Sequence, residues 1–298
     1  MEIYNGENNT TEKYNEPTTK RSFFPRSQLN DWLPLWEKIL FFLFGYLGLK
    51  IISRIMSYIF MSTSLVVFKD GVAYLTTLGS VLLNFLTYLL LCVGFIGILV
   101  FDKRKTYKKI LEEFKNPTSY LWALIGFGLV LGSQTLLSNI FAKCFTFYGS
   151  NNNESSLETM TKYYPVLLII MTAFFAPFCE ELTYRVGLVD VFGHIYKFRW
   201  VGLLASAVVF GLIHTDLIST YSKYFTLVQN SESTAEAIQT AKYTIYNEWL
   251  NLPIYAISGF CLAFTYAKSG KITSSMLAHM GVNLLSMLTT IISNTGGN

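Results

Sequence analysis

The sequence predicts an all-α fold, a polytopic membrane bundle of seven to eight transmembrane helices around a polar cavity. Charged residues make up 14% of the 298 residues, against about 25% in soluble globular domains. Apolar runs of about 20 residues, the length that crosses the hydrocarbon core of a bilayer, recur along the chain. Several of these runs contain ionisable residues, which are costly at membrane depth and therefore indicate a functional site.

The chain begins with a polar segment. Residues 1–33 mix acidic and basic residues with many Ser, Thr and Asn residues, and they lack the apolar core of a signal peptide. This composition favours a disordered or surface tail. Residues 34–298 are then expected to form the transmembrane domain.

The predicted spans lie near residues 35–60, 72–101, 118–142, 163–190, 199–216, 248–267 and 272–293. The first is interrupted by Lys38, Lys50 and Arg54, whose long side chains can reach the membrane surface while their stems stay in apolar surroundings. A capping-box pattern from Ser233 to Glu236 precedes the sixth span and predicts a short surface helix leading into it.

The loops indicate one orientation in the membrane. Residues 102–117 contain six Lys or Arg residues, and such basic loops face the cytoplasm. Counting spans from this loop predicts a cytoplasmic N-terminus and an external C-terminus. The linkers with Lys197 and Lys271 then lie inside, whereas residues 143–162 and 216–247 lie outside. The Asn-, Ile-, Lys- and Tyr-rich composition is typical of an AT-rich Gram-positive bacterium, so we expect the plasma membrane of a bacterium.

The first candidate motif follows the apolar run from Tyr163 to Phe178. Glu181 and Arg185 are four residues apart on a helix, with the carboxylate on the N-terminal side, which favours an ion pair. Glu180 lies about 100° around the helix from Glu181 and stays available for chemistry. On this stretch alone, a purely structural polar cluster is an equally good interpretation.

Two more motifs lie in later spans. Phe210 precedes His214 by four residues, and His279 precedes Asn283 by four, so each pair shares one helix face. A lone intramembrane His is more often a packing residue, but two such helices together with Glu180 favour a site. Glu180 and His214 could deprotonate a water. His279 and Asn283 could donate hydrogen bonds to the oxyanion that forms.

The order Glu-Glu-x-x-x-Arg, Phe-x-x-x-His and His-x-x-x-Asn resembles the CAAX protease and bacteriocin-processing (CPBP) family of intramembrane proteases. That family includes the CAAX-processing endopeptidase Rce1 and bacterial Abi proteins. The resemblance covers about residues 120–290, including the approach to the third motif from Gly259 to Gly270. It implies that the catalytic residues are Glu180, His214, His279 and Asn283, with Glu181 and Arg185 supporting them.

The sequence gives less support to two other chemistries, a zinc site and a thiol nucleophile. Glu, His and His are plausible ligands of a catalytic zinc, but no His-Glu-x-x-His places two ligands one helical turn apart. We therefore predict no bound metal and no cofactor, with zinc as the alternative. Cys179 is disfavoured as a nucleophile because it points away from the face of Glu180 and lies in apolar surroundings.

The predicted function is that of a hydrolase, an intramembrane endopeptidase with its active-site cavity in the bilayer. Its substrate would be a membrane-associated peptide or protein, in leader, pheromone or bacteriocin-related peptide processing or immunity. The alternative is a non-catalytic polytopic binding or immunity protein that sequesters a membrane or peptide partner. A transporter is a third interpretation, although no inverted repeats are visible. Nucleic-acid binding has no support, because the basic run is a loop next to the membrane.

Overall fold

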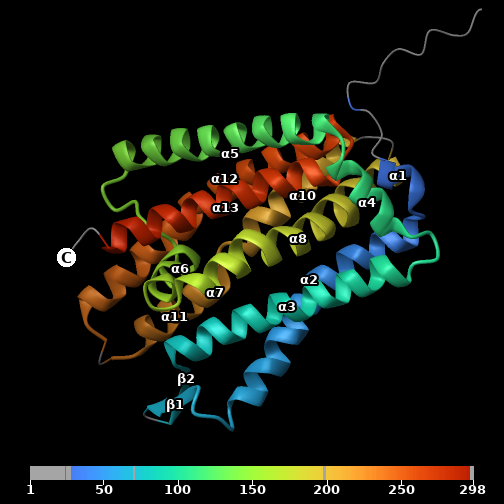
Figure 1. Ribbon diagram of the computed structural model, residues 1–298. Helices are drawn as coiled ribbons and strands as arrows, with labels where there is room; N and C mark the ends of the chain where they lie inside the picture. Colours follow the sequence, from blue (N-terminus) through green and yellow to red (C-terminus); the bar gives the residue numbers. More distant parts are fainter. Residues whose placement is uncertain (1–23, 25–27, 70, 197–198, 232, 296–298) are drawn as a thin grey trace, which may run out of the picture.

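The computed structural model describes residue 24 and residues 28–69, 71–196, 199–231 and 233–295. Long helices lie side by side in an elongated bundle (Figure 1), which confirms the all-α fold. Within the described ranges, six helical segments are long and apolar enough to cross a membrane, and a seventh is formed if the bent pair Arg199–Ile213 and Leu217–Gln229 is one span. The larger of these numbers equals the seven predicted spans.

The elements follow one another along the chain with short connections. They are α1 (Gln28–Trp32), α2 (Leu35–Phe60), β1 (Val66–Lys69), β2 (Val72–Leu75), α3 (Thr77–Phe101), α4 (Thr106–Phe114), α5 (Pro117–Cys144), α6 (Asn152–Tyr163), α7 (Pro165–Ile170), the π-helix η1 (Met171–Phe175), α8 (Ala176–Glu181), the π-helix η2 (Leu182–Val189), α9 (Asp190–Tyr196), α10 (Arg199–Ile213), α11 (Leu217–Gln229), α12 (Ala235–Ser269) and α13 (Ile272–Thr295).

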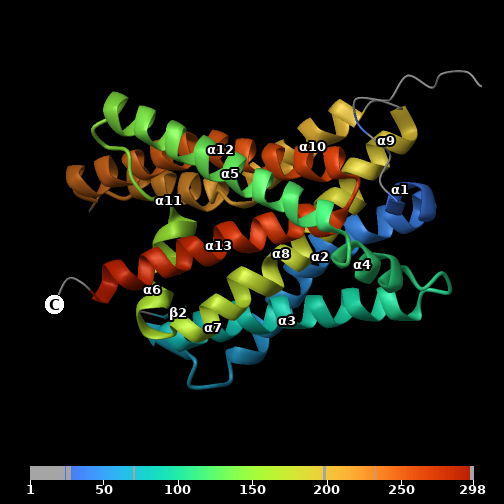
Figure 2. The same cartoon turned by 45° about the horizontal axis from the view of Figure 1, so that its top comes forward.

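The short elements gather at the two ends of the bundle. Figures 1 and 2 show α1 and α4 at one end, and the β1–β2 hairpin, α6 and the end of α13 at the other. The turn between α12 and α13 lies at the α4 end, where Glu113 accepts a hydrogen bond from the backbone N–H of Thr273 at 3.1 Å. The basic loop and the linker at Lys271 thus share one end of the bundle, as the predicted orientation requires; the orientation itself stays a prediction.

The start of the second predicted span is wrong. Residues 66–75 form an antiparallel hairpin in which Val66 pairs with Leu75, and Gly71 takes a positive φ of 77° at its turn. The helix begins after the hairpin, because Thr76 accepts a hydrogen bond from the backbone N–H of Gly79 at 3.0 Å and so caps it. The span is α3, from Thr77 instead of residue 72.

The short surface helix predicted before the sixth span is not a separate element in the structure. It is continuous with the span as the 35-residue helix α12, which contains Pro253. Its N-cap is Thr234 and not Ser233, since the Thr234 hydroxyl accepts a hydrogen bond from Ala237 N–H at 3.1 Å. The predicted tail, residues 1–33, lies mostly outside the described residues. Its last part joins the bundle, because Leu29 and Leu33 are buried in the main hydrophobic core.

Two glycines bring α2 against η2. A Cβ on Gly45 would lie 1.8 Å from the Thr183 hydroxyl oxygen, and one on Gly187 would lie 2.6 Å from the backbone nitrogen of Phe42. Small residues allow membrane helices to approach this closely. The second half of the fourth span is consequently enclosed, and every residue from Cys179 to Asp190 is buried.

Candidate active site

The fourth span, Pro165–Gly193, is interrupted by two π-helical segments on either side of α8. Pro177 explains the first. In η1 the bonding runs over five residues, as from Ala176 N–H to the Met171 carbonyl, so the next donor to the Thr172 carbonyl would be residue 177. Proline has no N–H. The sequence therefore leaves the Thr172 carbonyl without an intrahelical partner, next to the first motif.

Asn283 supplies the missing donor. Its side-chain amide nitrogen donates a hydrogen bond to the Thr172 carbonyl oxygen at 2.8 Å, across from α13 to η1. Polar side chains of neighbouring helices commonly satisfy a carbonyl that a proline has freed in a membrane helix. One of the two N–H groups of the predicted oxyanion donor is thus used to hold the backbone at the bend.

Glu181 and Arg185 form the ion pair that their spacing predicts. The guanidinium Nε donates to Glu181 Oε2 at 2.9 Å and Nη2 donates to Oε1 at 3.0 Å, with both side chains fully buried. Arg185 Nη1 also donates to the Ser206 hydroxyl at 2.5 Å, which fastens the pair to α10. Two parallel bonds between charged groups are strong and fix orientation. The pair is a rigid base for the groups around it.

His279 contacts both carboxylates. Its Nδ1 lies 3.0 Å from Glu181 Oε1, and its Nε2 lies 3.8 Å from Glu180 Oε2. Because Glu181 is an ionised acceptor held by Arg185, the imidazole presents its Nδ1–H to it. The sequence predicted only a supporting role for Glu181 and missed this contact, which lies between helices and leaves no trace in local spacing.

The two carboxylate oxygens of Glu180 differ in their hydrogen bonds. Oε1 accepts a hydrogen bond from the Tyr88 hydroxyl at 2.8 Å. Oε2 is buried and has no hydrogen-bond partner. Tyr88 belongs to α3 and was not predicted as a site residue. The one sequence signal for it is its place on the buried face of α3, seven residues after Val81 and four before Cys92.

His214 lies at the end of α10, beside the other groups. Its Nδ1 is 2.8 Å from the Phe210 carbonyl oxygen, so this nitrogen carries the proton of a neutral ring and Nε2 is left as an acceptor. The ring packs on Phe210 at 4.4 Å and stacks on Tyr255 at 4.9 Å between centroids. Among the described residues, no hydrogen bond joins the side chains of His214 and Glu180.

The Phe210 ring connects the second and third motifs. It lies 5.6 Å from the His279 ring and 5.4 Å from the Arg185 guanidinium. The four predicted catalytic residues and their two predicted supports therefore surround one place in the bundle. Arg185, Glu181 and His279 are linked directly, whereas His214 reaches them through Phe210 and Asn283 through the backbone of η1.

The side chains present do not fit a metal. In the part of the chain that the structure describes, no three His, Cys, Asp or Glu side chains are arranged as ligands of one ion. His279 Nδ1 faces Glu181 and His214 Nδ1 faces a carbonyl, so only their Nε2 atoms could bind. That the protein uses no metal stays a prediction.

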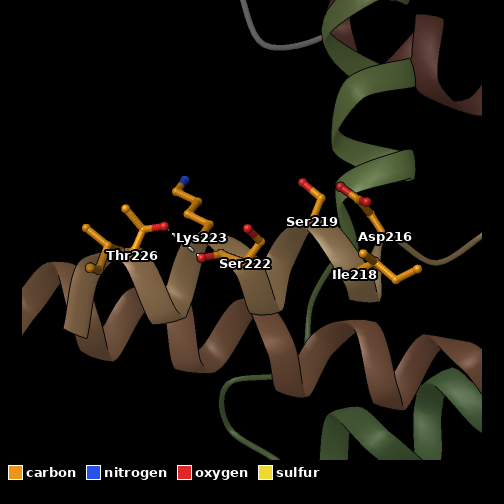
Figure 3. Close-up of a pocket in the computed structure, with 7 residues that line it drawn as sticks. Asp216, Ile218, Ser219, Ser222, Lys223 and Thr226 are labelled. Carbon is orange, nitrogen blue, oxygen red and sulfur yellow. Dashed lines mark hydrogen bonds between the residues drawn. The ribbon is translucent and has the colours of Figure 1, made fainter. Parts of the chain in front are cut away.

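Hollows on the surface lie away from this site. One of about 740 Å³ runs along α11, where Figure 3 shows its lining side chains, and none of the motif residues lines it. Another, of about 530 Å³, lies between α2, α3 and the start of α4, with the Glu37–Arg104 ion pair at its edge. The motif residues line neither of these hollows and lie inside the bundle.

Comparisons with known proteins agree with this assembly. The family model of type II CAAX prenyl endopeptidase Rce1-like proteins matches residues 162–285, which contain all three motifs. The chain is 27% identical over 168 residues to Bacillus subtilis YdiL, a candidate membrane peptidase, covering 55% of this chain and 54% of that protein. It is 29% identical over 126 residues to the membrane-embedded CAAX protease MroQ of Staphylococcus aureus, covering 40% and 51%.

A third relative is the UPF0177 protein YvdC of Lactococcus lactis, 30% identical over 149 residues that cover 49% of this chain and 53% of YvdC. No solved structure matches the chain significantly. The matches span about half the length of these curated relatives. The chain is an integral membrane protein, and the match over the region that carries the three motifs supports a relationship to the CPBP family.

Proposed function

We propose that the protein is an intramembrane endopeptidase that hydrolyses a peptide bond in a membrane-associated peptide or protein. One observation carries the proposal: Glu180 Oε2 is buried, has no hydrogen-bond partner among the described residues, and faces His279 Nε2 at 3.8 Å. A buried carboxylate oxygen without a hydrogen bond is costly. A water molecule bound there would remove this cost and would be the reactant of a hydrolase.

In the proposed reaction Glu180 is the general base. It takes a proton from the bound water on Oε2, and the water oxygen bonds to the carbonyl carbon of the substrate. His214 Nε2 accepts a hydrogen bond from the second O–H of the water and so orients the water. When the carbon–nitrogen bond breaks, Glu180 returns the proton to the leaving amine, so each turnover restores the site.

His279 is the proposed donor to the oxyanion. A proton on this imidazole gives the site two negative groups, Glu180 and Glu181, and two positive groups, Arg185 and His279. With Nδ1–H bound to Glu181, an Nε2–H on this ring would face Glu180 Oε2, where the reacting water is proposed to bind, and could donate to the oxyanion. Fixed donors of this kind stabilise the charge that develops in acyl transfer.

Asn283 has a narrower role in this proposal than its motif suggests. Because one amide N–H is bonded to the Thr172 carbonyl, only the other is left for an oxyanion. Its main contribution is to hold η1, and with it the approach to Glu180, in place. No cofactor takes part.

The substrate class follows from depth and from the relatives. A site inside a helix bundle suits a peptide that is itself embedded in or attached to the bilayer. One relative, MroQ, is named a membrane-embedded CAAX protease. Leader, pheromone or bacteriocin-related processing, and immunity to such peptides, are the proposed settings. The proposed location is a bacterial plasma membrane, with the N-terminus inside.

The experiment compares purified wild type with Glu180→Gln in lipid vesicles that contain a panel of short hydrophobic peptides. Mass spectrometry in H₂¹⁸O detects products and shows the label in the new carboxyl terminus, which only hydrolysis introduces. The matched control is Glu37→Gln, a carboxylate of α2 paired with Arg104 and outside the motifs. We expect labelled products from the wild type and the control and none from Glu180→Gln.

Two outcomes would contradict the proposal. Labelled products from Glu180→Gln at the wild-type rate would remove Glu180 from the mechanism. Loss of products on chelation, reversed by zinc, would replace the metal-free reaction. If no peptide is cleaved but one is retained equally by wild type and Glu180→Gln, the alternative of a binding or immunity protein is favoured.

A further inference from the structure

We infer that Tyr88 is a positioning residue for the general base, holding the Glu180 carboxylate so that a single oxygen is left to activate water. The inference rests on the proposed function and deepens it. The Tyr88 hydroxyl donates to Glu180 Oε1 at 2.8 Å, whereas Oε2 has no partner. Tyr88 belongs to α3, outside residues 162–285, so it brings into the site a part of the chain that the family model does not cover.

The backbone positions of α3 and α8 support this contact independently. Cys92, one helical turn after Tyr88, has its sulfur 3.3 Å from the sulfur of Cys179, the residue before Glu180. The Cys92 thiol also faces the Phe175 carbonyl at 3.6 Å. The same face of α3 therefore lies along the stretch that ends at Glu180, and the hydrogen bond from Tyr88 is part of an extended helix contact.

The chemistry of the two oxygens gives Tyr88 its role. A carboxylate can take a proton on either oxygen and can rotate, so an unrestrained base has several arrangements and only some meet the water. A hydrogen bond to one oxygen of an ionised group is about twice as strong as one between neutral groups. Bonded to Tyr88 through Oε1, Glu180 is held with Oε2 toward His279 Nε2. The proton from water then goes to Oε2.

A purely structural role would have the same geometry, and the two roles differ in what Tyr88→Phe changes. Tyr164→Phe is the matched control: both rings pack against the same hydrophobic cluster, and among the described residues the Tyr164 hydroxyl makes no hydrogen bond. With a peptide that the wild type cleaves, we expect kcat to fall about tenfold or more in Tyr88→Phe with KM unchanged, because Tyr88 touches the base and not the substrate.

A second readout needs no cleavage. Dicyclohexylcarbodiimide modifies protonated carboxyl groups in apolar surroundings, and peptide mapping by mass spectrometry locates the modification. A donated hydrogen bond stabilises the ionised carboxylate. We therefore expect dicyclohexylcarbodiimide to modify Glu180 faster in Tyr88→Phe than in the wild type or Tyr164→Phe. Glu113, modified in the same samples, should show no change.

The cysteine pair tests whether the substitution displaces the helix. Diamide should join Cys92 and Cys179 equally in wild type and Tyr88→Phe, as measured by counting free thiols after denaturation. An unchanged kcat and an unchanged modification profile would overturn the inference while leaving the protease proposal intact. Unequal cross-linking would also overturn it, in favour of a structural role. If the wild type cleaves nothing, the modification profile alone decides about Tyr88.

Discussion

Removal of the Asn283 amide should destabilise the protein because of Pro177, and the effect can be measured as a coupling between the two residues. In Asn283→Ala the Thr172 carbonyl loses its donor at 2.8 Å. A buried acceptor left without a partner costs about 1–3 kcal/mol, and hydrogen bonds between membrane helices reach about 1.7 kcal/mol at most. We therefore expect Asn283→Ala to lower the free energy of unfolding by about 1–2 kcal/mol.

Pro177→Ala changes this cost, since alanine restores a backbone N–H that can donate to Thr172. In that background Asn283→Ala should cost less, and the coupling between the two substitutions should be about 1 kcal/mol. Unfolding in mild detergent of the wild type, both single variants and the double variant gives all four values. Asn84→Ala is the matched control, because that amide bonds to the Ser80 carbonyl within its own helix at 2.9 Å.

Additive costs would refute the argument, since Asn283 would then not compensate for the proline. A coupling of the same size between Pro177→Ala and Asn84→Ala would also refute it, because Asn84 does not contact the Thr172 carbonyl. A wild-type stability of Asn283→Ala together with a large loss of kcat would assign the amide to the oxyanion instead.

The remaining predictions concern two buried ionisable residues, Arg185 and Glu113. Arg185→Met should lower the free energy of unfolding by about 3–5 kcal/mol, because it removes the guanidinium from the buried carboxylate of Glu181 and leaves that carboxylate only its contact with His279. Thermal unfolding measures this against Arg104→Met, whose partly exposed pair is worth at most about 1 kcal/mol. Burial in the loop helix α4 raises the pKa of Glu113 from 4.5 to about 7. The folded protein therefore holds a proton that the unfolded chain releases, and stability falls as pH rises from 4.5 to 7, by at most about 3 kcal/mol. Glu113→Gln should flatten this part of a pH series of unfolding midpoints.

Each of these has a clear contrary result. Equal losses for Arg185→Met and Arg104→Met would mean that burial does not decide the strength of the pair. An Arg185→Met variant that regains stability when Glu181→Leu is added would agree with the argument, because the unpaired charge is then gone. A pH dependence that is the same in wild type and Glu113→Gln would show that this carboxyl is ionised in the folded protein at pH 5.

The helices and their internal contacts were determined by the sequence alone. Apolar length predicts the spans, and spacing by four residues predicts that Glu181 meets Arg185 and that Phe210 shares a face with His214. These contacts depend only on the geometry of one helix, whose periodicity is constant. The interruption at Pro177 was not predicted from the sequence, although a proline removes a backbone donor wherever it lies in a helix. The start of α3 was predicted wrongly because residues 72–76 are apolar enough to continue a span. In the structure, Val72–Leu75 form a strand of the hairpin, and Thr76 is the N-cap of the helix.

Contacts between helices were decided only by the tertiary structure. These contacts depend on how each helix is rotated and how deep it lies in the bundle. They are the bond from His279 to Glu181, the bond from Tyr88 to Glu180, and the bond from Asn283 to a backbone carbonyl. The π-helical segments around α8 change both rotation and depth, because a bond over five residues widens the turn and shifts every side chain after it. Pro177 is a local cause of the first segment, but which side chains meet after the shift depends on the packing of α2, α3 and α13 on the fourth span.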